Sequence, residues 1–561
     1  MLAGCVPWPE ALRDRYRREG YWRGERLGDL TRDWAQRDGS RIALVAGSRR
    51  LTYADVDTRA DRLAAGLHHL GLRAHDRAVV HLPNIPEFVI VSLALFRLGA
   101  IPVFALAAHR RHEIQYLCDR AEAVAYVIPD RHQGFDYRTL AREVTMHAPA
   151  PRHVIVAGDP AEFVALDALD ADPEPLPPPD PQDAAFCLLS GGTTGLPKLI
   201  PRTHDDYSYQ LRATAEGLGF DEHGVYLAAL PAAHNAALGC PGVLGALKVG
   251  GKVVLATTPS PGDVFPLIAR ERVTLTTLIT PLVLLWMDAA DFMPVNLADL
   301  LLQVGGAKLD PEIGWKLRPK LGCALTQWFG MAEGLLCYTR VDDPDEIIVM
   351  TQGRPLCPAD ELRVVDDQDR DVAPGEVGQL LTRGPYTLRG YYREERHNAA
   401  AFTADGFLRA GDLVRITADG NLIVEGRLTD VINRGGEKIS PPDVEDHLVA
   451  HPGVREAAVF GIPDPILGER TCAVIVPSHG ALSLPELRTF LQGRGLAEYK
   501  LPDRLLTIDA LPRTNIGKVD RAVLRRLAAG PHANDAARGT GAASPAPAAA
   551  PAPAAAERTA S

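Results

Sequence analysis

The sequence has no long apolar run, no paired-cysteine motif and no excess of basic residues. None of its 561 residues fall in a stretch of about eighteen consecutive apolar positions, so no membrane-spanning helix is expected. The eight cysteines never form a C-x-x-C pair, which argues against a zinc site or a disulfide framework and favours reduced thiols in a cytoplasmic protein. The N-terminus lacks the apolar core of a signal peptide. With 60 basic against 71 acidic residues, a nucleic-acid partner is not expected.

The length and the composition of the chain indicate more than one folded domain. Apolar residues make up 46% and charged residues 23%, as in ordinary globular proteins, but 561 residues are too many for one core. From about Gly530 an Ala/Pro tract offers almost nothing to bury, and we expect disorder there. The predicted divisions are a core at 1–429, a hinge at 430–436, a small domain at 431–527 and a tail at 530–561.

Strands and helices alternate through the middle of the chain. Residues 183–190, 225–231 and 300–306 read as buried strands separated by helices, which predicts a parallel α/β sheet covered on both faces. Ligands of such sheets bind beyond the carboxyl ends of the strands. Short alternating strands after about residue 354 indicate a β-rich subdomain, and a mobile α+β domain follows. The fold class is thus a multidomain α/β and α+β protein.

The stretch SGGTTGLPKL (190–199) has the composition of a phosphate-binding loop. In the P-loop frame that starts at Gly192, Pro197 stands at a glycine position and Leu199 at the magnesium-binding Ser/Thr position. What remains is bare backbone, three hydroxyls and a lysine, which together can hold a polyphosphate. A plain surface turn is the alternative, so other motifs in the chain are needed to distinguish a phosphate-binding loop from a turn.

Five motifs that occur in a fixed order along the chain show a resemblance to a known family of enzymes. They are SGGTTGLPK (190–198), QWFGMAEG (327–334), GDLVR (411–415), GRLTDVINRGGEKI (426–439) and PRTNIGK (512–518). In this order they resemble the signature set of the adenylate-forming superfamily. Further segments, including LPAAHNAALGCPGVLG, LQVGGAKL and RGPYTLRGYY, resemble the stand-alone aryl-acid AMP ligases of siderophore pathways, a class of nonribosomal peptide biosynthesis. The likeness covers roughly residues 10 to 525.

The resemblance implies ATP and Mg²⁺ as cosubstrate and cofactor. Lys518 would bridge the substrate carboxylate and the α-phosphate, and Glu333 would hold Mg²⁺, since carboxylates are hard oxygen ligands. Asp412 and Arg427 match the ribose contacts. Considered one at a time, Glu333 could be a helix-cap acid, Asp412 a turn residue and Lys518 a surface lysine. That all three occur in the order of the family motifs favours a functional role for them. The other ATP and phosphate contacts implied are Ser190, Gly191, Gly192, Thr193, Thr194, Gly195, Lys198, Gly305, Gly306, Ala307, Gly330, Met331 and Ala332.

The segment AHNAALGCPG resembles the wall of an aryl-acid pocket. His234 matches a residue close to the reacting carboxylate, and the amide of Asn235 can bond an ortho hydroxyl. Salicylate-type relatives carry cysteine at the position of Cys240, whereas dihydroxybenzoate enzymes carry serine there. Leu336, where dihydroxybenzoate enzymes tend to carry valine, also favours a substrate of the salicylate type. The structural alternatives are that His234 is a histidine packed in the core and that Cys240 is a small packing residue at the start of a helix. The pocket set implied is His234, Asn235, Ala236, Gly239, Cys240, Gly306 and Leu336.

The same segment departs from the family after Asn235. Relatives usually carry an aromatic residue and then proline, whereas this chain has Ala236 and Ala237, and Gly239 is minimal. We therefore expect a wider pocket that accepts a substituted salicylate or a bicyclic hydroxy acid.

The resemblance also implies two catalytic poses. The small domain would swing about Asp430, so that the loop with Gly435, Gly436 and Lys438 lines the path of an acceptor thiol. An ordinary N-cap or turn aspartate is the structural alternative for Asp430. A separate aryl carrier protein with a phosphopantetheine arm is the expected partner. An aryl-CoA synthetase, a dihydroxybenzoate ligase, a luciferase-like oxidase and a non-enzymatic binding module are the alternatives.

Overall fold

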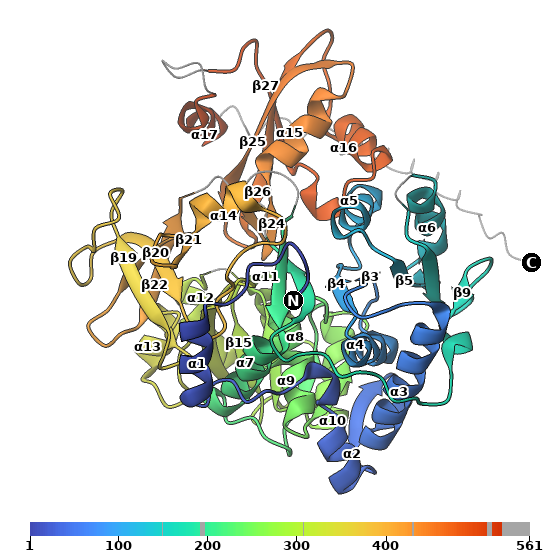
Figure 1. The fold of residues 1–561 in the computed structure, drawn as a ribbon. Coiled ribbons are helices and arrows are strands. Elements are labelled where there is room, and N and C mark those ends of the chain that lie inside the picture. The colour runs from blue at the N-terminus through green and yellow to red at the C-terminus, as the bar shows by residue number, and fades with distance from the viewer. Residues whose placement is uncertain (148–149, 191–196, 307, 429–430, 513–518, 530–561) are drawn as a thin grey trace, which may run out of the picture. The chain divides into compact units, whose positions relative to one another are not determined.

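The computed structural model describes residues 1–147, 150–190, 197–306, 308–428, 431–512 and 519–529 (Figure 1). Met1–Leu511 form one compact unit. Pro512–Ser561 form a second unit, of which the structure describes α17 (Arg521–Ala529). Throughout the described ranges, no helix combines the length and the apolar character that crossing a bilayer requires. All eight cysteines are free thiols, in line with the expectation from their spacing.

One sheet of the large unit is built from the first two hundred residues. Its described strands lie in the order β11 (Leu199–Thr203), β10 (Ala184–Leu189), β4 (Ile101–Phe104), β3 (Arg77–Val80), β5 (Ala125–Pro129), β8 (His153–Ala157) and β9 (Val164–Ala165). All neighbours are parallel except β10 and β11. The helices beside it are α3 (Tyr53–Leu70), α4 (Pro86–Leu98), α5 (Arg111–Ala121) and α6 (Tyr137–Thr145) (Figure 1).

Successive residues of β3 show how both faces of this sheet are covered. Val80 packs in one apolar cluster with Phe88 of α4, whereas Val79 packs in another with Ile114 of α5. Because successive strand side chains point to opposite faces, an apolar run can serve both clusters only where helices lie on both sides.

The second large sheet carries most of the predicted site. Its described strands lie in the order β18 (Arg354–Pro355), β17 (Leu336–Tyr338), β16 (Ala324–Gly330), β15 (Leu301–Val304), β14 (Leu275–Leu278), β12 (Val225–Ala228), β13 (Lys252–Leu255), β1 (Ile42–Ala46) and β2 (Arg49–Thr52). From β16 through β1 all neighbours are parallel. The sequence prediction of a parallel α/β sheet is therefore confirmed.

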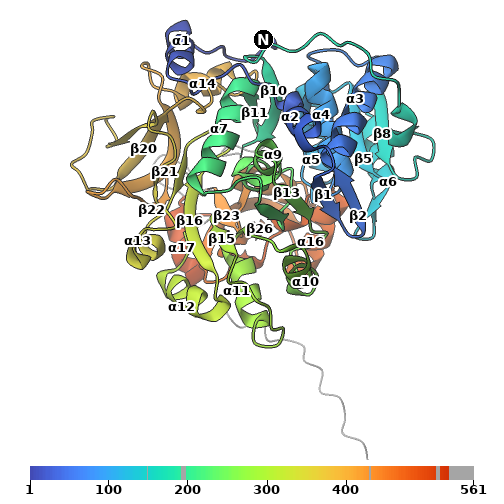
Figure 2. The ribbon, with the colours of Figure 1, turned by 90° about the horizontal axis from the view of Figure 1, so that it is seen from below.

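Two groups of helices cover the two faces of this sheet (Figure 2). One face packs in the same apolar cluster as α7 (His204–Gly217), α8 (Asn235–Gly239) and α9 (Gly242–Lys248). The other face packs with α10 (Pro261–Glu271), α11 (Thr280–Ala289) and α12 (Pro311–Leu321). The remaining helices before residue 402 are α1 (Glu10–Arg18), α2 (Arg32–Asp38), α13 (Asp345–Met350) and α14 (Glu395–Ala401).

Helix α7 begins with a reciprocal pair of capping residues, Thr203 and Asp206. The Thr203 hydroxyl accepts from the backbone N–H of Asp206, and the Asp206 carboxylate accepts from the backbone N–H of Thr203. This reciprocal capping satisfies N–H groups that the first helical turn leaves without partners. It also fixes the start of the helix that supplies Tyr207 to the site.

The β-rich region and the last lobe of the large unit follow the predicted order. An antiparallel sheet contains β19 (Glu361–Val365), β20 (Gly378–Arg383), β21 (Leu408–Ile416) and β22 (Leu422–Arg427). The C-terminal lobe then comprises β23 (Ile432–Arg434), β24 (Glu437–Ile439), α15 (Pro441–Val449), β25 (Val454–Asp464), β26 (Gly468–Pro477), α16 (Leu484–Gly493) and β27 (Arg504–Thr507). Part of the predicted hinge, 430–436, is thus strand β23, and Ile432 on this strand enters the apolar core of that lobe. The placement of the domain boundaries stays a prediction.

Candidate active site

Loops at the carboxyl ends of parallel strands bring the predicted residues to one edge of the second sheet. His234 follows β12, Gly305 and Gly306 follow β15, and Glu333 follows β16. These strands run parallel, so their carboxyl ends share one edge, where ligands of open α/β sheets bind. Met331 and Ala332 lie between Gly330 and Glu333 in the same connection and are half-buried.

The two ends of the glycine-rich loop are tied together. The Ser190 N–H donates to the Lys198 carbonyl at 2.9 Å, and the Lys198 N–H donates to the Ser190 hydroxyl at 2.9 Å. Ser190 and Lys198, which bound this loop, therefore lie side by side at the ends of β10 and β11. The predicted phosphate contacts Gly191, Gly192, Thr193, Thr194 and Gly195 lie outside the described residues, so they remain predictions.

A buried lysine and a carboxylate lie close together at this turn. Burial lowers the pKa of Lys198, while the nearby carboxylates of Glu394 and Glu333 act against that shift. The Tyr391 hydroxyl donates to Glu333 Oε1 at 3.0 Å and so orients the carboxylate. An oriented carboxylate beside a lysine and a hydroxyl fits a Mg²⁺ that carries phosphate oxygens. The sequence prediction missed the roles of Tyr391 and Glu394. Tyr391 lies within the RGYY segment at 389–392 and Glu394 two residues beyond it, and this segment was the available signal.

His234 presents a neutral imidazole with a defined tautomer. Its Nδ1 accepts from the backbone N–H of Ala236 at 3.2 Å, so the side chain caps the start of α8. Desolvation by the surrounding protein lowers the pKa of His234 to about 4, and the positive charge of Lys438 adds to this effect, although part of the side chain is open to solvent. The proton therefore resides on Nε2, where the ring can donate a hydrogen bond to a carboxylate.

Asn235 has its amide orientation fixed by a tyrosine of α7. The Tyr207 hydroxyl donates to Asn235 Oδ1 at 2.9 Å, which leaves the NH₂ group as the donor side of the amide. That NH₂ group lies 3.8 Å from Cys240 Sγ. Burial raises the pKa of the Cys240 thiol to about 12, so it is neutral. A neutral thiol is a weak hydrogen-bonding group beside the amide, as the sequence interpretation of Cys240 requires.

The wall around Gly239 differs from the expected wide pocket. A Cβ atom at Gly239 would lie 2.1 Å from the Tyr207 hydroxyl oxygen, so Tyr207 already occupies the space beside this glycine. Gln210 adds to the same wall, since its amide donates to the Gly239 carbonyl at 2.9 Å. The small residue at 239 therefore makes room for Tyr207 and does not widen the pocket, which corrects that part of the sequence interpretation. Ala236 and Leu336 are buried in the same apolar cluster.

Gly305 and Gly306 have different physical reasons to be glycine. A Cβ at Gly305 would lie 2.4 Å from the indole of Trp328, so this residue permits a close approach of the ring. Gly306 has φ +83°, in the left-handed region that glycine adopts without strain. The Gly306 carbonyl accepts from the Asn433 amide at 2.9 Å. Ala307, predicted to line the nucleotide, lies outside the described residues.

The two residues that were predicted to contact the ribose, Asp412 and Arg427, lie on neighbouring strands of the β-rich sheet. Asp412 on β21 is buried and lies opposite Arg427 of β22 in the strand register. The predicted hinge Asp430 and the predicted catalytic Lys518 lie outside the described residues, and they remain predictions.

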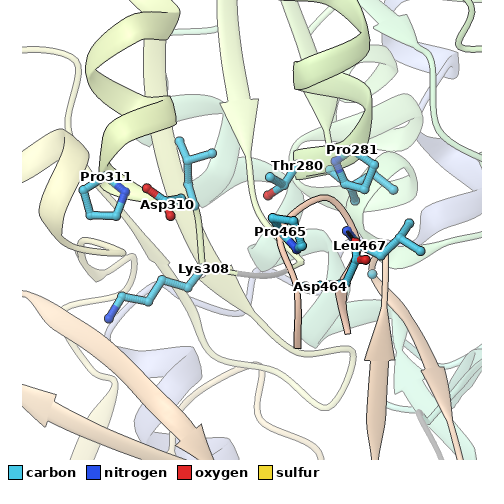
Figure 3. Close-up of a pocket in the computed structure, with 13 residues that line it drawn as sticks. Thr280, Pro281, Lys308, Asp310, Pro311, Asp464, Pro465 and Leu467 are labelled. Carbon is cyan, nitrogen blue, oxygen red and sulfur yellow. Dashed lines mark hydrogen bonds between the residues drawn. The ribbon is translucent and has the colours of Figure 1, made fainter. Parts of the chain in front are cut away.

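A pocket of about 300 Å³ lies where the predicted thiol path should be (Figure 3). Gly435 and Gly436 line it together with the start of α11 and the β25–β26 turn. Figure 3 shows Thr280 and Pro281 on one side and Pro465 and Leu467 near them. The full lining is Ile279, Thr280, Pro281, Lys308, Leu309, Asp310, Pro311, Gly435, Gly436, Asp464, Pro465, Leu467 and Gly468. Lys438, two residues beyond Gly436, acts electrostatically on His234. Lys438 of the predicted thiol path is thus close enough to the predicted acid-pocket residue His234 to influence its charge.

The low pKa of His234 predicts a pH-dependent stability. An unfolded chain protonates this histidine near pH 6.5, whereas the folded protein resists protonation until about pH 4. The unfolded state therefore binds more protons between these values, and the stabilising contribution is lost as the pH falls. Because the His234 side chain is exposed, water screens this effect, and the loss from pH 7 to pH 5 should be about 1 kcal/mol or less.

Urea unfolding at several pH values checks this expectation by comparing wild type with His234→Gln. The variant should lose less stability than wild type on going from pH 7 to pH 5, because the proton-binding group is gone. Identical pH profiles for the two proteins would contradict the assignment. Two buried acids with raised pKa values, Asp205 and Asp360, contribute with the opposite sign, but they are the same in both proteins and cancel in the difference.

Comparisons with known proteins agree with this geometry. The family model described as AMP-binding enzyme matches residues 31–392, and the AMP-binding enzyme C-terminal domain matches residues 443–518. The 2,3-dihydroxybenzoate-AMP ligase of Bacillus subtilis is 56% identical over 94% of this chain and 98% of its own length. A salicylyl-CoA synthase / salicylate adenylyltransferase of a Streptomyces species is 51% identical, with coverages of 94% and 98%. The apo structure of MbtA from Mycobacterium smegmatis matches with a TM-score of 0.73 and 46% identity, covering 93% of this chain and 99% of that one.

Proposed function

This chain belongs to the family of AMP-binding enzymes, and from this premise we propose that it activates an aryl acid of the salicylate type with ATP and passes it to a thiol. It is an ATP-dependent acid–AMP ligase. The observation that carries the substrate class is the wall of α8: a neutral His234 donor, an Asn235 amide oriented by Tyr207, and the neutral thiol of Cys240. A fatty acid offers no ring hydroxyl for that amide.

The first reaction joins the carboxylate to the nucleotide. A carboxylate oxygen forms a bond to the α-phosphorus of ATP, the bond to the β-phosphate bridging oxygen breaks, and pyrophosphate leaves with the electron pair. Two anions must approach, so positioning and charge neutralisation account for most of the rate. His234 Nε2–H holds the carboxylate, and the turn between Ser190 and Lys198 holds the departing phosphates.

A bound Mg²⁺ would neutralise the charge that grows on the phosphate oxygens. Glu333, held by the Tyr391 hydroxyl, is the residue that would carry it. Lys518 would neutralise charge between the carboxylate and the α-phosphate; this role rests on its match to the family motif.

The second reaction moves the acyl group to sulfur. A thiol loses its proton to solvent as its sulfur forms a bond to the acyl carbon, the bond from the acyl carbon to the phosphate oxygen breaks, and AMP leaves with that electron pair. The pocket beside Gly435 and Gly436 supports the proposal of a thiol route to the His234 end of the acid site. The acceptor that we propose is the phosphopantetheine arm of a separate aryl carrier protein in siderophore biosynthesis.

Exchange of pyrophosphate into ATP tests the proposal with a panel of acids. Salicylate, 6-methylsalicylate, 2,3-dihydroxybenzoate, 3-hydroxyquinaldate, benzoate and octanoate would be compared by kcat/KM. We expect salicylate or a ring-substituted salicylate to exceed benzoate by about tenfold or more, because Asn235 is left unpaired without the ortho hydroxyl. A strict preference for 2,3-dihydroxybenzoate would overturn the role of Cys240, and exchange with octanoate alone would overturn the substrate class.

The acceptor is decided by a separate assay. With the preferred acid, thioester formation is measured with free CoA and with a phosphopantetheinylated aryl carrier protein. A strong preference for CoA would select the aryl-CoA synthetase alternative, which the name of the Streptomyces relative makes worth testing.

A further inference from the structure

A histidine on α14 lies beside the lysine that ends the glycine-rich loop. His397 is half-buried, and its ring meets the ring of Tyr391 edge-on, with centroids 5.0 Å apart and an interplanar angle of 61°. The positive charge of Lys198 acts on the imidazole. Within the described ranges, neither ring nitrogen of His397 has a hydrogen-bond partner. None of the five sequence motifs contains this histidine, and the reaction described above gives it no role.

Four contacts join His397 to the residues expected at the phosphates. Lys198 lies near the carboxylate of Glu333, which accepts from the Tyr391 hydroxyl at 3.0 Å. Tyr391 in turn packs against His397, and His397 lies near Lys198. Because each of the four side chains has two of the others as neighbours, they border one region. His397 is therefore placed at the phosphate end of the proposed nucleotide site.

Backbone hydrogen bonds fix the position of α14 at this site. The Tyr392 N–H donates to the Leu199 carbonyl at 3.0 Å, which ties the segment before α14 to the start of β11. Asn398 then binds α14 to the same segment, since its Oδ1 accepts from the Tyr391 N–H at 2.8 Å and its amide donates to the Tyr391 carbonyl at 2.9 Å. His397 precedes Asn398 directly, so the bonds that position Tyr391 also position this imidazole.

A neutral imidazole suits a hydrogen-bond donor at this place. Desolvation lowers the pKa of His397 to about 4, and the charge of Lys198 adds to the effect, so the ring carries one N–H at neutral pH. A neutral donor does not repel Lys198 before the nucleotide binds, yet it can donate to a phosphate oxygen that Lys198 attracts. Hydrogen bonds to a charged acceptor are stronger than those between neutral groups. The structural alternative is a histidine that only packs against Tyr391.

We propose that His397 is a further phosphate-binding residue of the first reaction. Its ring N–H donates to an oxygen of the β- or γ-phosphate of ATP and keeps this hydrogen bond to the departing pyrophosphate, without transferring the proton. The inference rests on the proposed role of Lys198 at the departing phosphates. It follows that His397 contributes to the binding of ATP and pyrophosphate but not to that of the aryl-adenylate, which has neither phosphate.

Binding measurements separate these phosphates from the rest of the nucleotide. Calorimetry gives the Kd of Mg·ATP and of an unreactive aryl-adenylate analogue with a sulfamate in place of the phosphate, and exchange gives the KM for pyrophosphate. His397→Phe keeps a ring against Tyr391 and removes the N–H. It should raise the Kd of Mg·ATP and the KM for pyrophosphate by about tenfold or more, and leave the Kd of the analogue within about threefold. His397→Gln retains an N–H donor and should recover part of the loss.

Two control variants test the specificity of the effect. His479→Phe makes the same change at an exposed histidine after β26 and should alter none of the constants. Tyr391→Phe removes the hydroxyl that holds Glu333, so at saturating ATP it should raise the Mg²⁺ concentration that gives half-maximal exchange. His397→Phe should leave this concentration unchanged, because the proposed contact is to phosphate. His397→Ala replaces the phenylalanine variant if that protein does not fold.

Unchanged constants for Mg·ATP and pyrophosphate in a folded His397→Phe protein would overturn the inference. Equal weakening of the analogue, no recovery in His397→Gln, or a raised Mg²⁺ requirement in His397→Phe would assign this histidine to packing and overturn it as well. The absence of exchange with every aryl acid would reject the proposed function, whereas the Kd of Mg·ATP would still decide the role of His397.

Discussion

Lys518→Met is expected to lower the rate of acyl-adenylate formation by about 10²- to 10³-fold. The substitution keeps a long side chain and removes the ammonium group that the family motif places between the carboxylate and the α-phosphate. Because charge grows on the phosphoryl oxygens in the transition state, a missing cation should lower kcat more than it raises KM. Transfer of the acyl group from preformed aryl-adenylate to the thiol should stay within about threefold of wild type, because that step does not need this cation.

Pyrophosphate exchange measures the first step, and thioester formation from supplied aryl-adenylate measures the second. Lys316→Met is the matched control, because it removes an ammonium group from an exposed position on α12. Lys316 is 71% exposed, and its ammonium group lies 3.8 Å from the carboxylate of Glu312. This variant should leave both rates unchanged. Normal exchange by a folded Lys518→Met protein would contradict the mechanism. An equal loss of rate in both steps would contradict the assignment of Lys518 to the first step alone.

Lys500→Met is expected to lower the free energy of unfolding by about 3–5 kcal/mol. The ammonium group of Lys500 lies 2.9 Å from Glu113 Oε1 and 2.8 Å from Asp443 Oδ2. All three side chains are at most 6% exposed, so removing the cation would leave two buried carboxylates facing each other. The nearby positive charges hold the pKa values of Glu113 and Asp443 below their usual values. That contribution is therefore present at pH 7 and is lost as the pH falls through the carboxylate range.

Denaturant unfolding at pH 7 tests the expectation. The exposed Lys316→Met should cost less than about 1 kcal/mol, because pairs in water contribute little. Adding Glu113→Gln to Lys500→Met should recover part of the loss, since one of the unpaired charges is removed. A Lys500→Met protein as stable as wild type, or one that Glu113→Gln destabilises further, would show that the ion cluster is not what holds this region.

The histidines beside this cluster look like metal ligands, but their hydrogen bonds argue otherwise. Ligand atoms of His112, Asp443 and His447 lie within 4.8 Å of one another. However, the Arg494 Nε–H donates to His447 Nδ1 at 2.9 Å, so the neutral ring carries its proton on Nε2, the atom that would face the metal. Lys500 also holds the other oxygen of Asp443. The group is better described as an ion network that joins α5 to the C-terminal lobe.

Much of the fold could be predicted because its signals are local. The capping pair at Thr203 and Asp206 and the buried strands at 183–190 and 300–306 depend on neighbours in the sequence, and the structure has them within a few residues. Gly435 and Gly436 line a pocket, but their predicted role in the path of the thiol stays a prediction. Lys518, Asp430 and most of the glycine-rich loop lie outside the described residues, so their roles stay predictions.

The sequence by itself determined the motif order and the parallel α/β core, and it predicted the residue types of the acid pocket, since each depends on short-range patterns. Only the tertiary structure decided what surrounds them. Tyr207 fills the space at Gly239, the indole of Trp328 fills the space at Gly305, and Lys500 meets Glu113 from 387 positions away. Packing brings together side chains that are distant along the chain, and the shape of a pocket is the space they leave. A small residue in the sequence therefore shows that room is needed, but not which neighbour takes it.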